Sequence, residues 1–130
     1  MSNAMLKGVV SPEISFINHL PSGMKLSLDT KCSYNVKYSN ELRCQGEMTV
    51  EMMAKEEPEK FIIKTKTIGI FTYKDGSDKD LLHVETFKIL FPYVRALVST
   101  VTANAGIPPV ILPEINIEGQ SIYRIEKGLL

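Results

Sequence analysis

Apolar and polar residues alternate along two long stretches of this chain, which is the pattern of β-strands with one buried face. The even positions are mostly apolar through residues 25–38, and the same period resumes from Leu42 to Ala54 after a polar break at residues 39–41. These two stretches predict a long antiparallel hairpin. A third stretch rich in Ile, Thr and Phe, residues 61–73, follows a charged turn and extends the hairpin into a meander.

A shorter strand is predicted before the hairpin, over residues 12–17, and a Pro-Ser-Gly loop at residues 21–23 separates the two. The chain therefore contains four predicted strands. We expect them to form one antiparallel sheet.

The apolar period changes after residue 78 to the spacing of an amphipathic helix. Pro92 lies inside that pattern and predicts a kink or a break into two helices near Leu90, while Gly106 is expected to end the helix. The helical stripe consists of Phe87, Leu90, Phe91, Val94, Leu97, Val98 and Val101.

The residues after the helix form an apolar stretch that contains three prolines, residues 107–117. Proline is excluded from central strands, and this stretch is too apolar for a solvated loop, so we expect it to pack against another surface. Residues 118–130 carry apolar side chains at helical spacing and predict a short terminal helix. Strands followed by helices indicate an α+β fold.

Composition narrows the classes of function. Fifteen basic and fifteen acidic residues balance, which argues against nucleic acid or an anionic membrane as a partner. Residues 1–4 resemble a scar from an expression vector, which leaves residues 5–130 as a single domain without a membrane-spanning stretch or signal segment. Two cysteines without metal-ligand spacing suit a reducing cytoplasm, and a domain this small gains stability by oligomerising.

Catalytic chemistry is not evident in the sequence. The two histidines, His19 and His83, lie before a loop and in the polar first turns of the helix, where a structural role is the simpler interpretation. The acidic clusters at residues 56–59 and 75–80 fit solvated turns and a helix N-terminus better than a metal site. Cys32 and Cys44 lie on the apolar phase of adjacent strands, as buried thiols or, less simply, a redox pair. We predict no enzyme activity and no cofactor.

Three motifs resemble the SecB family of export chaperones. The hexapeptide LFPYVR at residues 90–95 is similar to the family's LFPYAR, KLSLDT at residues 25–30 resembles its KLDLDT, and GIF at residues 69–71 matches its GIF. The proline-rich stretch after the helix also resembles the family's loop. The resemblance runs from about residue 13 to residue 123.

The resemblance implies a chaperone that holds unfolded polypeptide in apolar grooves between the sheet, the crossing loop and the terminal helix. It also implies dimers that pair through sheet and helix, and tetramers built from such dimers. Each groove candidate fits the core equally well, and the methionines at 48, 52 and 53 fit either adaptable binding surface or ordinary sheet packing. The groove candidates are Leu26, Leu28, Phe71, Tyr73, Val110, Leu112, Ile115, Ile117, Ile122 and Tyr123.

Two positions bear on the family's partner, the translocation ATPase SecA. Glu13 retains one acidic residue that the resemblance assigns to SecA docking, but Lys64 stands where the family has another, so the sign is reversed. Docking to SecA through these contacts is therefore not expected. The alternatives are a dedicated chaperone for one partner, such as an antitoxin, and a module that binds a small apolar ligand.

Overall fold

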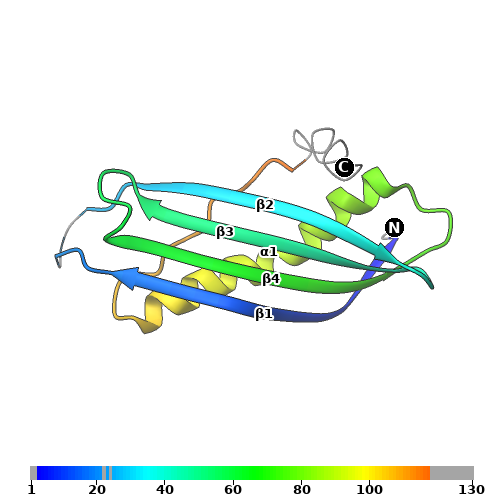
Figure 1. The fold of residues 1–130 in the computed structure, drawn as a ribbon, viewed down its shortest axis with the longest axis horizontal. Coiled ribbons are helices and arrows are strands. Elements are labelled where there is room, and N and C mark those ends of the chain that lie inside the picture. The colour runs from blue at the N-terminus through cyan, green and yellow to red at the C-terminus, as the bar shows by residue number, and fades with distance from the viewer. Residues whose placement is uncertain (1–2, 22, 24, 118–130) are drawn as a thin grey trace.

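In the part of the chain that the structure describes, four antiparallel strands form one sheet, and one long helix crosses one of its faces (Figure 1). The structure is a computed structural model that describes residues 3–21, 23 and 25–117. The strands are β1 (Ala4–Asn18), β2 (Leu28–Ser39), β3 (Arg43–Ala54) and β4 (Phe61–Tyr73), in the sheet order β1-β4-β3-β2, and the helix is α1 (Lys79–Asn104). The predicted α+β fold with a four-stranded antiparallel sheet is confirmed.

The predicted hairpin is β2 and β3, which pair without interruption from Leu28 opposite Ala54 to Ser39 opposite Arg43. Its tight turn holds Glu41 at φ 68° and Leu42 at φ 58°, the left-handed conformation that short hairpin turns require. Strand β2 begins at Leu28, so the prediction that it begins at residue 25 is wrong.

Strand β1 is much longer than the predicted residues 12–17. Its pairing with β4 shifts between Leu6 and Gly8 and again between Val10 and Glu13. Each irregularity inserts an extra residue and reverses which side chains face the core, so the alternation disappears from the sequence although the strand continues. Ala4, one of the four residues that resemble a vector scar, lies in this strand and is buried.

Helix α1 is continuous from Lys79 to Asn104, so the prediction of one long helix is confirmed and the alternative, a break into two helices near Leu90, is excluded. Asp78 caps its start, since the carboxylate accepts a hydrogen bond from the Asp80 amide at 2.8 Å. Gly106 follows the end with φ 88°, as its predicted role as the stop signal requires. Pro92 lies inside the helix and is exposed.

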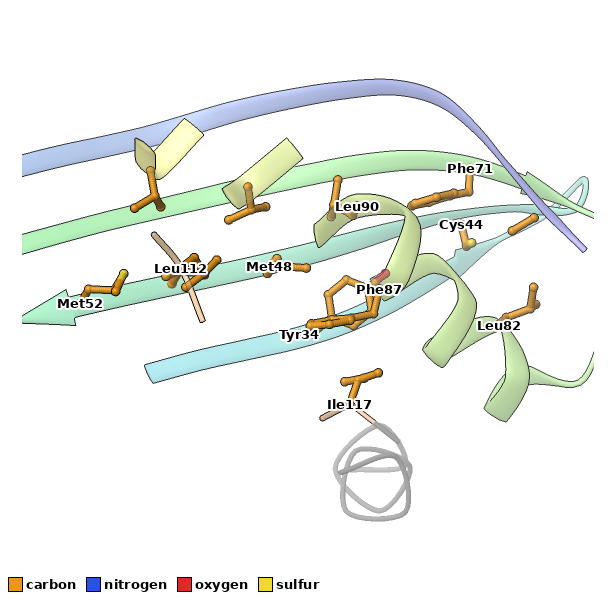
Figure 2. Packing of buried hydrophobic residues seen from close by; sticks show 14 of the residues in the cluster. Tyr34, Cys44, Met48, Met52, Phe71, Leu82, Phe87, Leu90, Leu112 and Ile117 are labelled. Carbon is orange, nitrogen blue, oxygen red and sulfur yellow. The ribbon is translucent and has the colours of Figure 1, made fainter. Parts of the chain in front are cut away.

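The core lies between α1 and the inner face of the sheet (Figure 2). The Tyr34 hydroxyl donates a hydrogen bond to Thr86 Oγ1 at 2.6 Å, and Thr86 in turn donates to the Leu82 carbonyl. Phe87 packs edge-on against Tyr34. This polar chain inside an apolar core fixes the first half of the helix against β2.

Strand alternation places the three methionines of β3 on two different faces of the sheet. Met48 and Met52 belong to the core on the inner face of β3, whereas Met53 is half-buried on the opposite face. The three therefore do not form one adaptable surface, and ordinary packing is correct for Met48. Met52 also reaches a cleft in the surface.

Candidate functional site: an apolar cleft under the crossing loop

The chain from residue 107 to residue 117, here called the crossing loop, runs from the end of α1 across the inner face of the sheet toward β2 (Figure 1). Two hydrogen bonds attach it to the helix: the Val110 amide donates to Thr102 Oγ1 at 2.8 Å, and Ser99 Oγ donates to the Val110 carbonyl at 2.9 Å. Prolines occupy positions 108, 109 and 113, which stiffens the loop. The prediction that this stretch packs against another surface is confirmed.

Two side chains fasten the crossing loop into the core. Leu112 has no exposed surface and packs near Met48 and Met52, and Ile117 is 2% exposed beside Tyr34 (Figure 2). Burying a leucine completely stabilises the loop position by about 1.5–3 kcal/mol. The loop is therefore a fixed wall in the described structure.

A cleft of about 650 Å³ opens between this wall and the start of β2. Its floor comes from Leu28, Thr30 and Met52 on the inner face of the sheet, and the segment after β1 contributes a second wall. None of the described residues that line it is charged. The residues around it are Asn18, Leu20, Pro21, Gly23, Leu26, Leu28, Thr30, Met52, Ile107, Pro108, Val110, Ile111 and Pro113.

Three of the predicted groove residues, Leu26, Leu28 and Val110, lie together at this cleft. Leu28 is the first residue of β2, and Leu26 lies two residues before it. Both side chains line the cleft. Their meeting with Val110 joins residues that are more than eighty positions apart in the sequence.

Three other predicted residues are core side chains. Phe71, Leu112 and Ile117 are fully or almost fully buried, which favours the core over the groove, the two alternatives that the sequence left open for them. Phe71 lies under the first half of α1, where the helix covers the sheet, and the other two fasten the crossing loop. Ile117 also borders a second, shallower pocket.

The remaining groove predictions fall elsewhere. Tyr73 packs edge-on against Tyr38, at the other end of the sheet, and is separate from the cleft. Ile115 lines the second pocket, of about 350 Å³, beside the stacked rings of Phe87 and Phe91. Ile122, Tyr123 and the predicted terminal helix lie outside the described residues.

Sequence reasoning missed Ile111, which is 59% exposed at the mouth of the cleft. Neighbours in an extended segment face opposite sides, but only the burial of Leu112 in the structure shows that Ile111 is the one that faces outward. Thr30 was passed over because it is polar, and Leu20 and Ile107 because they lie outside regular elements.

The outer face of the sheet carries both charges. The pairing register sets Glu13 opposite Lys66, and places Lys64 between Ser15 and Glu51. Glu47 forms ion pairs with Lys37 at 2.8 Å and Lys66 at 3.7 Å, and the hydrogen bond from Lys37 holds the pKa of Glu47 below its usual value. This face is therefore mixed in charge rather than acidic.

His83 and the two cysteines have surroundings that indicate a structural role. His83 is buried with its ring against Tyr34. Cys32 pairs opposite Val50 and Cys44 opposite Tyr38, so the two thiols lie six residues apart along the hairpin and are no redox pair. Burial raises the pKa of the Cys44 thiol to about 11, which suppresses its reactivity at neutral pH.

The described residues hold neither a cluster of metal ligands nor a membrane-spanning helix. Residues 3–117, with their two gaps, contain no cluster of three potential metal ligands among His, Cys, Asp and Glu. Helix α1 falls short of the combined length and apolarity that a membrane crossing requires, and no other described helix meets that requirement.

Comparison with known proteins gives consistent results. The model of the family described as preprotein translocase subunit SecB matches residues 9–127. The uncharacterized protein MJ0357 of Methanocaldococcus jannaschii is 35% identical over 99 residues, which cover 74% of this chain and 64% of that protein. The protein-export protein SecB of Alcanivorax borkumensis is 36% identical over 101 residues, 68% of this chain and 64% of that protein. The chain thus spans less than two thirds of the length of both relatives.

A solved structure shares the fold. The Mycobacterium tuberculosis SecB-like chaperone Rv1957, in complex with a ChAD peptide from the antitoxin HigA1, superimposes with a TM-score of 0.70 at 15% identity, over 87% of this chain and 91% of that one.

Proposed function

The chain belongs to the SecB family, and on this premise we propose that it is an ATP-independent holding chaperone that binds unfolded polypeptide in the cleft under the crossing loop. The family consists of non-enzymatic chaperones. Client binding then requires only burial of apolar side chains, without a bond made or broken.

The observation that carries the proposal is the open, uncharged lining of the cleft. Each Å² of apolar client surface that enters it contributes about 25 cal/mol, so a few aliphatic side chains give useful affinity without a defined sequence. Leu26 and Ile111 are substantially exposed at its mouth although they are large and apolar. Such exposed surface is costly in water and marks a place where something binds.

The same lining supports clients over a small ligand. Two different chain segments and the sheet border the cleft, and among the described residues it is open to solvent rather than enclosed. A pocket for a small apolar ligand encloses most of its occupant. An open cleft instead suits a segment of a longer polymer.

A dedicated chaperone for one partner is the second candidate function. The mixed charge of the outer face, with Lys64 and Lys66 at its centre, gives little support to docking of SecA through an acidic surface. The SecB-like chaperone of similar fold is recorded with an antitoxin peptide. Affinity for SecA separates an export chaperone from a dedicated one.

Self-association is part of the proposal. Strand β1 is an edge strand in the described sheet, and five of its apolar side chains are exposed, which is unusual for an unprotected edge. Pairing of two β1 edges would cover them and continue the sheet into a dimer. The exposed side chains are Met5, Val9, Val10, Ile14 and Ile17.

An aggregation assay tests the function. We expect the protein at stoichiometric concentration to suppress aggregation of a reduced, slow-folding client without ATP, as a dimer or tetramer by light scattering. Ile111→Asp should abolish suppression because it places a charge at the mouth of the cleft. Leu81→Asp is a matched control, since Leu81 has the same 59% exposure as Ile111 but lies on α1. Equal suppression by both variants would exclude the cleft.

A further inference from the structure

We infer that the outer edge of β2 beside the cleft binds client as an added β-strand, with apolar residues at every second position and an acidic residue opposite Lys31. This inference rests on the proposed function and specifies the class of segment that the cleft accepts. It favours extended, alternating segments over amphipathic helices.

A client segment in the cleft needs hydrogen-bond partners for its backbone. A client segment that leaves water must find partners for its backbone amides and carbonyls. Five crossing-loop residues line the cleft, and three of them offer it no amide hydrogen: Pro108 and Pro113 lack one, and the Val110 amide already donates to Thr102. The loop wall therefore contributes apolar contact but little backbone pairing.

The edge of β2 supplies what the loop lacks. Strand β2 lies at the end of the sheet order and pairs only with β3 among the described strands. Leu28 and Thr30, which form part of the floor of the cleft, belong to this edge strand. A strand added here would satisfy its backbone on β2 and direct alternate side chains into the cleft.

Two charged side chains lie on the face of β2 that is turned away from the cleft. Asp29 and Lys31 alternate with Leu28 and Thr30, so they direct their side chains away from the cleft. Both are exposed, and neither forms an ion pair with another described residue. The side chains of an added strand that face away from the cleft would lie beside them. A carboxylate opposite Lys31 is then favoured, and a second lysine there is disfavoured.

Labelled peptides test the pattern. One nine-residue peptide has valine at alternate positions with threonine and glutamate between them, and its partner has the same composition with valines at helical spacing. We expect the alternating peptide to bind at least about tenfold more tightly by fluorescence anisotropy. Methylating its edge-facing amides should remove that advantage, because each methyl blocks one backbone hydrogen bond. Equal affinity of the two patterns, or indifference to methylation, would overturn the inference.

A charge exchange tests the register. Lys31→Glu should weaken the glutamate peptide about two- to fivefold and strengthen a lysine version similarly. Lys74→Glu makes the same charge change in the exposed turn after β4, at the other end of the sheet from the cleft, and should change neither affinity. If Lys31→Glu does not distinguish the two peptides, the pairing opposite Lys31 is wrong.

The outcomes separate this inference from the proposed function. Suppression of aggregation without any preference for the alternating peptide would leave the chaperone and remove strand addition. Failure to suppress aggregation would instead overturn the proposed function itself.

Discussion

The two ends of the inner face of the sheet are built from similar apolar side chains but have opposite properties. At the closed end, under the first half of α1, Phe71, Leu82 and Leu90 have no exposed surface. At the open end, under the crossing loop, Leu26 and Ile111 remain exposed around a cleft. The difference lies in the cover: a helix supplies a continuous row of side chains, whereas a proline-rich loop contacts the sheet at a few points only.

The difference implies that stability and function are separated along the sheet. Substitutions at the closed end should unfold the protein, and substitutions at the open end should affect client binding alone.

The largest expected effect comes from truncating Phe71 at the closed end. Phe71→Ala should lower the free energy of unfolding by about 3–5 kcal/mol, since it leaves a cavity in a tightly packed core. Urea denaturation measures this, with Leu26→Ala at the open end as the comparison, for which a loss below about 1 kcal/mol is expected. Equal losses at the two positions would show that the ends do not differ.

Removing the Thr86 hydroxyl should have the next largest effect. Thr86→Val deprives the buried Tyr34 hydroxyl of its acceptor and should cost about 1–3 kcal/mol. The double variant with Tyr34→Phe removes both partners, and we expect it to recover part of that loss in a double-mutant cycle. Additive losses would argue that the hydrogen bond does not fix the helix to β2.

High pH should weaken the closed end progressively. Burial raises the pKa of Cys44 to about 11 and that of Tyr38 to about 12, above their ordinary values of 9.0 and 10.0. The folded state therefore holds these protons more tightly, and this contribution to stability is complete below about pH 9 and declines as the pH rises toward 11. Thermal unfolding between pH 8 and pH 11 measures it. Cys44→Ala should make the decline shallower, and an unchanged slope would exclude the thiol as a cause.

The smallest effect on stability is expected at the mouth of the cleft. Ile111→Asp should change the free energy of unfolding by less than about 0.5 kcal/mol, because its side chain is mostly in water. Loss of client holding in a variant with an unchanged free energy of unfolding would show that the open end serves binding and not stability. Global unfolding would instead assign Ile111 to the core.

Gly46 shows how closely the closed end is packed. A Cβ at this position would overlap the Tyr34 hydroxyl, so the missing side chain in β3 leaves room for the ring that crosses it. The open end has no comparable constraint among its described residues. The crossing loop, which forms the wall of the cleft, instead depends on the buried Leu112. That burial was not apparent from the sequence, because Leu112 is one of several aliphatic residues placed among prolines.

Strand alternation and helical spacing determined much of this protein without any coordinates. The alternating period in residues 28–54 identified the hairpin, and residues 61–73 were assigned to β4 with the observed boundaries. The spacing of Phe87, Leu90 and Val94 identified the buried side of α1. These signals are local, because each residue's phase within a regular element sets the direction of its side chain.

Only the tertiary structure decided which apolar residues are core and which form the cleft. Leu26, Phe71 and Leu112 are equivalent by sequence, yet one lines an opening and two are buried. The bulges in β1 were likewise not predicted, and neither were the side chains that fasten the crossing loop into the core. Exposure depends on what the rest of the chain lays over a residue, and that cover comes from segments too distant in sequence to leave a mark on the local pattern.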